Sequence, residues 1–186
     1  LDAYGGADVL HAFWLGAAST LALGVGRWRR LPVVASIGGG ELVWLPEIGY
    51  GGAASWRHRQ QVRLALHGAQ VITGGSRYAL APVLPTRPDA RWVPLGVDAA
   101  FYRGDRAEAE RQPGPPWRLL HAASINRVKD QAVLLHALRL VADQEEGVHL
   151  DWFGEDTLGG ALSLLARDLD LAAHVTFHGV QPADVL

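Results

Sequence analysis

The sequence predicts an α/β protein that contains two groups of parallel strands. Strand-length apolar segments alternate with helix-length segments, and glycine, proline or polar residues separate them. Segment 32–37 (PVVASI) is apolar on both faces, as expected for a strand buried inside a parallel sheet. Segment 104–116 is charged and then rich in proline, which suits a surface linker. We therefore expect two Rossmann-like units, at 1–103 and 117–186.

The first half of the chain reads as four strands and three helices. The expected strands are 8–13, 32–37, 70–73 and 91–94. Segment 15–24 fits a helix that ends on a glycine. Segment 55–67 fits a second helix, and Ser76 is placed to cap a third. The side chains available for the inner side of the second helix are Val62, Leu64, Ala65 and Leu66.

The second half repeats this pattern. The expected strands are 117–123, 148–153 and 174–178, and the expected helices are 131–142 and 160–168. Asp130 is a suitable N-cap for the first of these helices. Beyond the strand–helix alternation, the two halves share no sequence repeat.

The composition excludes several classes of protein. Hydrophobic residues make up 49% and charged residues 19%, a globular balance, and the net charge of −2 gives no reason to expect nucleic acid as a partner. The absence of cysteine excludes disulfides and thiolate metal sites. Of 17 basic residues only Lys129 is a lysine, which makes this position notable. The uncharged segment 9–26 contains polar residues and glycines, so we interpret it as a strand, a turn and a helix rather than a membrane span.

Segment 124–130 (SINRVKD) is the strongest candidate site. It lies between the end of a strand and the start of a helix, where α/β proteins bind ligands and where unpaired N–H groups favour phosphate. Arg127 and Lys129 would add positive charge, with Ser124 and Asn126 beside them. The alternative is a solvated basic loop of the kind common at helix starts.

Three weaker candidates also follow strands. Gly38 and Gly39 would let the backbone approach a ligand and Glu41 could orient a hydroxyl, although the residues alone favour an ordinary turn with an exposed acid. His11 stands near a strand end, but a lone histidine on an apolar strand is more often a satisfied core residue. Gly154 and Glu155 suit ligand contact or a capped turn.

No histidine spacing indicates a metal, no serine sits in a nucleophile elbow, and a dinucleotide fingerprint is absent, which disfavours a nicotinamide-dependent oxidoreductase.

At these segments the chain resembles glycosyltransferase family 4, also called group 1. DVLHAFWLGAAS is similar to the family's strand-end histidine motif, and WVPLGVD to its interdomain signature. ASINRVKDQAVLLHAL resembles its donor-phosphate loop and the following helix, while VHLDWFGED and VTFHGVQPADVL resemble the next two strand–loop pairs. The order and spacing of these motifs match the family along nearly the whole chain.

The resemblance implies a GT-B fold, two Rossmann-like parallel-sheet domains, both incomplete here, and a metal-free, configuration-retaining glycosyltransferase. It implies that Arg127 and Lys129 hold the donor diphosphate, that His11 lies near the transferred sugar, and that 38–41 lines the first-domain side of the cleft. Gly154, Glu155, Gly179 and Val180 would lie near the nucleoside. No separate cofactor is implied, since a nucleotide-diphosphate sugar is the donor substrate; the acceptor would be a glycan, a lipid or a small molecule.

The chain also departs from the family pattern. Ser124, Phe13 and Leu95 stand where an arginine, a second histidine and an asparagine are common. The paired-glutamate motif and the early glycine-rich loop do not occur within the 186 residues, and the chain has no methionine, so we expect a fragment that is inactive alone. The preference for arginine over lysine, with abundant alanine, glycine and leucine, indicates a bacterial source. A non-catalytic nucleotide-binding module is the alternative. We expect a cytoplasmic location; contact with a membrane surface stays open, because no strongly amphipathic basic helix is evident.

Overall fold

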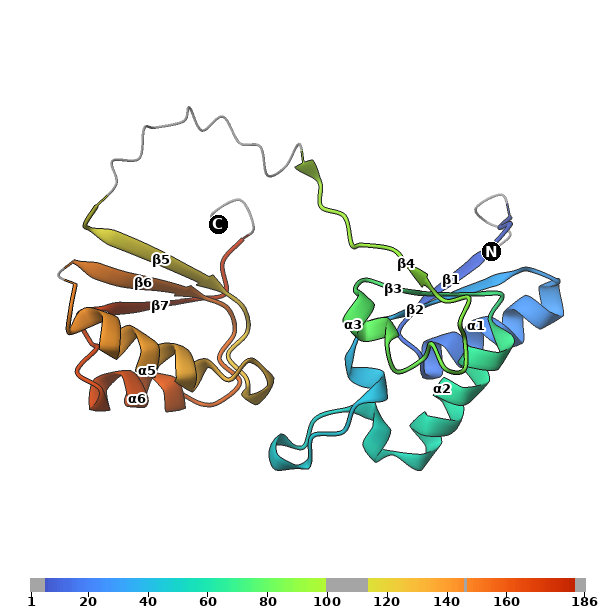
Figure 1. Cartoon of the computed structure of the whole chain (residues 1–186), viewed down its shortest axis with the longest axis horizontal. Coiled ribbons are helices and arrows are strands. Elements are labelled where there is room, and N and C mark those ends of the chain that lie inside the picture. Colours follow the sequence, from blue (N-terminus) through green and yellow to red (C-terminus); the bar gives the residue numbers. More distant parts are fainter. Residues whose placement is uncertain (1–5, 100–113, 146, 183–186) are drawn as a thin grey trace. The chain divides into compact units, whose positions relative to one another are not determined.

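The computed structural model describes residues 6–99, 114–145 and 147–182, and the chain divides into two compact units, 1–104 and 105–186 (Figure 1). Each unit contains one parallel sheet with helices, so the predicted pair of Rossmann-like α/β units is confirmed. Of the predicted linker 104–116, only 114–116 lies within the described residues.

The sheet of the first unit has the strand order β1-β2-β3-β4, and all its pairings are parallel. Its strands are β1 (Leu10–Phe13), β2 (Val33–Ile37), β3 (Val71–Gly74) and β4 (Arg91–Trp92). Its α-helices are α1 (Ala17–Arg29), α2 (Trp56–Gly68) and α3 (Arg77–Leu80). Short 3-10 turns lie between β2 and α2, at Gly40–Leu42, Pro46–Ile48 and Gly52–Ala54. Buried residues of the strands and helices form one core, which holds the helices on one face of the sheet.

Helix α1 does not end at Gly24, as the sequence predicted, but continues to Arg29. Gly26 is buried against β2, where an added Cβ would lie 2.6 Å from Val33 Cγ2. Glycine therefore serves close helix–strand packing here, and the helix is capped by Arg30, which adopts a left-handed conformation.

Two predicted helix details are confirmed and one is wrong. Ser76 caps α3 by accepting a hydrogen bond from the Ala79 N–H at 3.0 Å. Helix α2 buries Val62, Ala65 and Leu66 as predicted. Leu64, however, is 57% exposed, because its position turns it away from the sheet.

The second unit has the strand order β5-β6-β7, again entirely parallel. Its strands are β5 (Trp117–Ala122), β6 (Val148–Phe153) and β7 (Val175–Gly179), and its helices are α5 (Gln131–Ala142) and α6 (Ala161–Asp168). A 3-10 turn, η5 (Arg127–Lys129), precedes α5. Both helices lie against the same face of the sheet, where Trp152 and Leu150 are fully buried (Figure 1).

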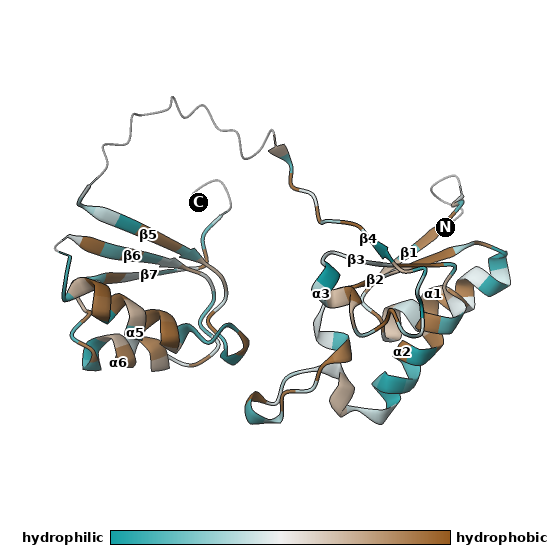
Figure 2. Cartoon of the chain, in the orientation of Figure 1, coloured by the Kyte–Doolittle hydropathy of each residue, from teal (hydrophilic) through white to brown (hydrophobic). Residues whose placement is uncertain are grey.

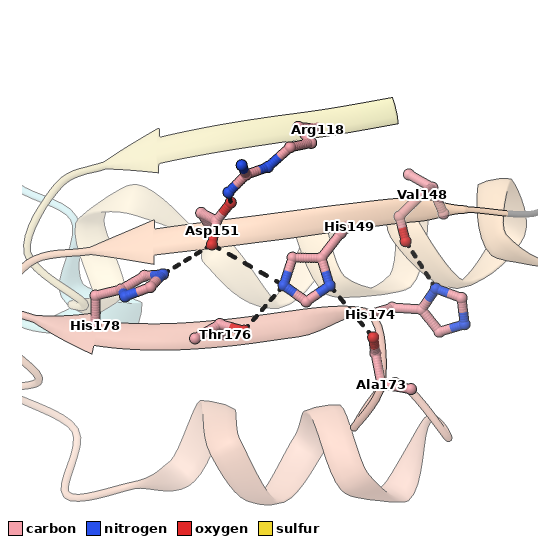
Figure 3. A network of polar contacts seen from close by, with 8 residues as sticks. All are labelled: Arg118, Val148, His149, Asp151, Ala173, His174, Thr176 and His178. Atoms are coloured by element: carbon pink, nitrogen blue, oxygen red, sulfur yellow. Dashed lines mark hydrogen bonds and ion pairs between the residues drawn. The ribbon is translucent and has the colours of Figure 1, made fainter. Parts of the chain in front are cut away.

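Asp151 points to the opposite face of this sheet, where it joins a polar network (Figure 3). Its carboxylate accepts hydrogen bonds from Arg118 Nη2 at 2.7 Å and from His178 Nε2 at 2.8 Å. His149 approaches the same carboxylate at 4.0 Å and contacts Thr176 Oγ1 at 2.9 Å. These partners keep Asp151 only 8% exposed and hold its pKa below the ordinary value, through the His178 hydrogen bond first and Arg118 second.

Segment 9–26 carries no formal charge, but it forms β1 and most of α1 and not one continuous helix. Within the described parts of the chain, no helix has the length and apolarity needed to cross a membrane.

Candidate functional site

In the second unit, the loops that follow the three strands are joined at one edge of the sheet. The Ala123 N–H donates to the Phe153 carbonyl at 2.9 Å, and the Gly154 N–H donates to the Gly179 carbonyl at 2.8 Å. The structure therefore brings the predicted positions Ser124, Gly154 and Gly179 to a single edge, the carboxyl edge at which parallel α/β sheets bind ligands.

Gly154 is required here by the backbone itself. Its φ is +140°, and an added Cβ would lie 2.1 Å from the Ala123 carbonyl oxygen. Only a residue without a side chain lets the loops after β5 and β6 approach this closely. Gly154 therefore holds the edge together, whether or not a ligand also contacts it.

The two loops continue side by side past Gly154. The Ile125 N–H donates to the Glu155 carbonyl at 2.7 Å, and the Thr157 N–H donates to the Ile125 carbonyl at 3.1 Å. Asp156 accepts hydrogen bonds from the N–H groups of Leu158 and Gly160 at 2.8 and 2.7 Å, so it forms a capped turn. The Glu155 side chain is exposed beside this turn. No group of three potential metal ligands occurs within the described residues.

Asn126 organises the candidate phosphate loop. Its Oδ1 accepts from the N–H groups of Val128 and Lys129 at 3.1 and 3.2 Å, and its Nδ2 donates to Ser124 Oγ at 2.9 Å. The N–H groups of Val128 and Lys129, which we expected to be available to phosphate, therefore already have a hydrogen-bond acceptor. The role of Asn126 is to fix the turn that presents Arg127 and Lys129.

Arg127 and Lys129 both point into solvent beside the start of α5. Asp130 occupies the N-cap position as predicted, but it has a φ of +45° and makes no capping hydrogen bond with its side chain. The first turn of α5 also contains no acidic residue. Two cationic side chains, Arg127 and Lys129, and one carboxylate, Asp130, thus lie beside this helix start, and the net positive charge favours an anionic ligand.

Gln131 is a buried residue that the sequence analysis missed. It is 3% exposed, and its side chain accepts from the Asn126 N–H at 3.1 Å and donates to the Ser124 carbonyl at 3.0 Å. Its Nε2 also donates to His121 Nε2 at 3.1 Å. Burial, and then the charge of Lys129, lower the pKa of His121, which keeps this ring neutral as an acceptor. The only signal in the sequence was a polar residue at the first position of an apolar helix.

In the first unit, His11 is not the satisfied core residue that its apolar strand suggested. It is exposed on the sheet face opposite the helices, and its Nε2 contacts Ser36 Oγ at 2.7 Å. Ser36 Oγ in turn contacts Thr73 Oγ1 at 2.6 Å. A chain of hydrogen bonds therefore crosses β1, β2 and β3 and holds the His11 ring in place.

Glu41 is buried, not exposed as the simple-turn interpretation required. It is 6% exposed, and its carboxylate accepts from the N–H groups of Gly38, Gly39 and Leu15 at 2.8, 2.6 and 3.2 Å. Three backbone donors thus satisfy the buried carboxylate. Glu41 ties the loop after β2 to the loop after β1.

The glycines of this loop make room for aromatic rings. An added Cβ at Gly38 would lie 1.9 Å from the Trp14 indole, and one at Gly40 would lie 2.4 Å from the Tyr50 hydroxyl. A cavity of about 450 Å³ opens beside them. It is lined in part by Phe13, Trp14, Glu41, Tyr50 and His58. Its volume lies within the usual range for small-molecule sites, roughly 300–1,000 Å³.

The predicted site residues thus form two groups, one in each unit. In the first unit, Gly38, Gly39 and Glu41 follow the end of β2, whereas His11 is the second residue of β1, is linked to Ser36, and is not among the residues that line the cavity. The second-unit group contains Ser124, Asn126, Arg127, Lys129, Gly154, Glu155, Gly179 and Val180 at the ends of β5, β6 and β7. Val180 is 72% exposed, directly after β7.

The fold is similar to that of solved nucleotide-sugar proteins. Anabaena Alr3699/HepE in complex with UDP matches with a TM-score of 0.67 and 18% identity, over 96% of this chain and 49% of that chain. A putative UDP-N-acetylglucosamine 2-epimerase from Listeria monocytogenes matches with a TM-score of 0.58 and 12% identity, over 98% and 50%. The lipopolysaccharide outer core galactosyltransferase WaaB matches with a TM-score of 0.56 and 14% identity, over 97% and 46%.

These matches show a Rossmann-like fold of the GT-B type, as the sequence predicted. The chain spans about half the length of each of these structures. No protein-family model matches the chain, and no curated protein matches it.

Proposed function

We propose that this chain belongs to a glycosyltransferase that transfers a sugar from a nucleotide-diphosphate donor with retention of configuration. The observation that carries the proposal is the loop after β5. There, Asn126 and Gln131 fix a turn that presents Arg127 and Lys129 next to an uncapped helix start. Positive charge placed where a diphosphate leaves would stabilise the transition state of transfer.

The fold similarity supports UDP as the nucleotide. HepE was solved with UDP, and with UDP and glucose, and WaaB is a galactosyltransferase. In the proposed reaction the oxygen of an acceptor hydroxyl forms a bond to the anomeric carbon, the bond from that carbon to the diphosphate oxygen breaks, and the hydroxyl proton is taken up by the departing UDP. Arg127 and Lys129 would take up the developing negative charge. Ser124, Gly154, Glu155 and the turn at Gly179 and Val180 would surround the rest of the nucleotide.

The first unit would contribute the sugar and acceptor side. His11 is exposed and oriented through Ser36, so we propose that it contacts the transferred sugar. Glu41 already accepts three backbone hydrogen bonds, so we propose that it acts by shaping the loop around Gly38 and Gly39. The cavity beside this loop would receive part of the acceptor.

The similarity to a UDP-N-acetylglucosamine 2-epimerase supports a second candidate function. An epimerase inverts a sugar carbon and leaves the product attached to UDP, whereas a transferase releases free UDP. The basic loop serves diphosphate binding in both cases, so the fate of the sugar decides between them.

The test is turnover of UDP-glucose and UDP-N-acetylglucosamine by the protein at its full length, with and without sugar acceptors. We expect release of UDP and an α-linked product from an α-linked donor.

Lys129→Ala should lower kcat/KM by about 10²–10³-fold, as removal of a charge-stabilising donor does elsewhere. Arg167→Ala, which removes an exposed arginine on α6, should change it little. Inversion at C2 without UDP release would assign an epimerase, and unchanged kinetics in Lys129→Ala would remove this residue from the mechanism.

A further inference from the structure

Helix α1 exposes an apolar stripe on the side that faces away from the sheet. Its buried residues are Ser19 and Gly26, whereas Leu21 is 70% and Trp28 75% exposed. Leu21 and Trp28 are seven residues apart, so they lie on the same side of the helix. A shallow groove of about 520 Å³ follows this stripe. It is lined by Ala17, Thr20, Leu21, Gly24, Val25, Trp28 and Gln61.

Helix α2 extends the same surface. It contacts α1, and Gln61 contributes to the groove. Because α2 buries Val62 and Ala65, residues on its opposite side face solvent, and among these Leu64 is 57% and Trp56 64% exposed. We call the outward residues of both helices the outer surface. It comprises Leu21, Val25, Trp28, Trp56 and Leu64, with Arg27, Arg29, Arg30, Arg57 and Arg63 around them.

The formally charged side chains of helices α1 and α2 are all positive. Neither α1 nor α2 contains an acidic residue, although together they contain five arginines, and Arg30 caps α1. The Arg29 guanidinium lies 4.6 Å from the centre of the Trp28 ring. Unit 1–104 has 10 basic and 6 acidic residues, a net charge of +4, while unit 105–186 has 7 and 13, a net charge of −6. The basic residues are therefore gathered in the unit that carries the exposed tryptophans of α1 and α2.

The second unit provides an internal comparison. Its helix α5 also exposes apolar side chains, with Leu140 64% and Val133 60% exposed, and Figure 2 shows the hydrophobic colour along it. Single exposed leucines are common on protein surfaces and need no partner. Helix α5, however, contains one arginine and no tryptophan. The combination of exposed tryptophan, leucine and several arginines belongs to α1 and α2.

We propose that the outer surface binds the face of an anionic lipid bilayer. Leucine and tryptophan side chains would enter the boundary between headgroups and acyl chains, and the arginines would reach lipid phosphates with their long side chains. Within the described residues no helix can cross a membrane, so this contact is peripheral. Charge complementarity favours a bilayer rich in anionic lipid, because such a surface meets every arginine without requiring a matching protein shape. The proposal does not depend on sugar transfer.

The experiment is co-sedimentation of the 186-residue chain with lipid vesicles. The vesicles contain phosphatidylcholine alone, or phosphatidylcholine with about 30% phosphatidylglycerol, an anionic lipid. We expect partitioning onto the anionic vesicles only, weakened at least about tenfold between roughly 0.05 M and 0.5 M NaCl. Leu21→Gln and Trp28→Ala should each lower partitioning by about tenfold, and Arg27→Gln and Arg57→Gln by about fivefold each.

Leu140→Gln is the matched control, because Leu140 is 64% exposed, close to the 70% of Leu21, on a helix of the other unit. It should leave partitioning unchanged, and circular dichroism should show that every variant is folded. The proposal is overturned if anionic vesicles do not bind the chain, or if Leu21→Gln and Leu140→Gln behave alike. It is also overturned if sedimentation velocity shows a dimer that Trp28→Ala abolishes while vesicles stay unbound, since the stripe would then be a protein interface.

Discussion

At the scale of single residues, two buried carboxylates connect parts of the chain that are distant in the sequence. Glu41 accepts three backbone hydrogen bonds in the first unit, and Asp151 is held by Arg118 and His178 in the second. Each carboxylate is buried and accepts its hydrogen bonds from groups on neighbouring loops or strands. Neither role could be predicted from the sequence, because it depends on side chains and amides that are distant along the chain.

Asp151 gives the protein a defined response to acid. Because its pKa is lower in the folded protein, the unfolded chain binds the proton first on acidification. The stabilisation is therefore present above about pH 4, the ordinary value, and is lost as the pH falls through the lowered pKa. Asp151→Asn should lower the free energy of unfolding at pH 7 by about 1 kcal/mol.

Urea unfolding followed by tryptophan fluorescence at pH 7 and near pH 3, below the ordinary pKa, tests this prediction. The variant should lose less stability than the native protein between the two pH values. Asp168→Asn, an exposed aspartate on α6, is the control. Equal acid sensitivity in the native protein and Asp151→Asn would show that the Asp151 network contributes nothing.

At the scale of elements, the close approach of the loops after β5, β6 and β7 creates the candidate donor site. Gly154→Ala should displace the loop that contains Ser124 and Asn126, because its Cβ would meet the Ala123 carbonyl oxygen. We expect a loss of about 2–4 kcal/mol in the free energy of unfolding, from backbone strain and overpacking together.

Gly159→Ala is a matched control for this variant. Gly159 also has a positive φ, of +62°, but nothing lies within 4 Å of an added Cβ, so only the left-handed conformation is strained. It should cost about 1 kcal/mol. If thermal or urea unfolding gave equal losses for both variants, the contact between these loops would not be what constrains Gly154.

Strand and helix placement followed closely from the sequence, and side-chain roles did not. The segment predicted at 148–153 matches β6, and 131–142 matches α5, because buried apolar strands and a periodic helix are local patterns. The end of α1 was mistaken because Gly24 looked like a stop, whereas tertiary packing at Gly26 lets the helix continue. Gln131 was missed because its partners Ser124, Asn126 and His121 meet only in three dimensions.

At the scale of the whole molecule, the two units differ in charge as well as in their candidate sites. The basic first unit carries His11, Glu41 and the outer surface, and the acidic second unit carries the basic loop around Lys129. This local positive charge in an otherwise acidic unit is the reason we propose the loop as the diphosphate site.

Titration of the isotopically labelled 186-residue chain with UDP, followed by amide NMR, tests the central claim most directly. We predict that saturating UDP shifts the amides of 124–131 and 154–155, that Lys129→Ala weakens binding by about tenfold, and that Arg167→Ala does not. NADH should leave these amides unchanged. If NADH shifted them and UDP did not, or if UDP bound without involving 124–131, the assignment of this loop as a nucleotide-diphosphate site would be wrong.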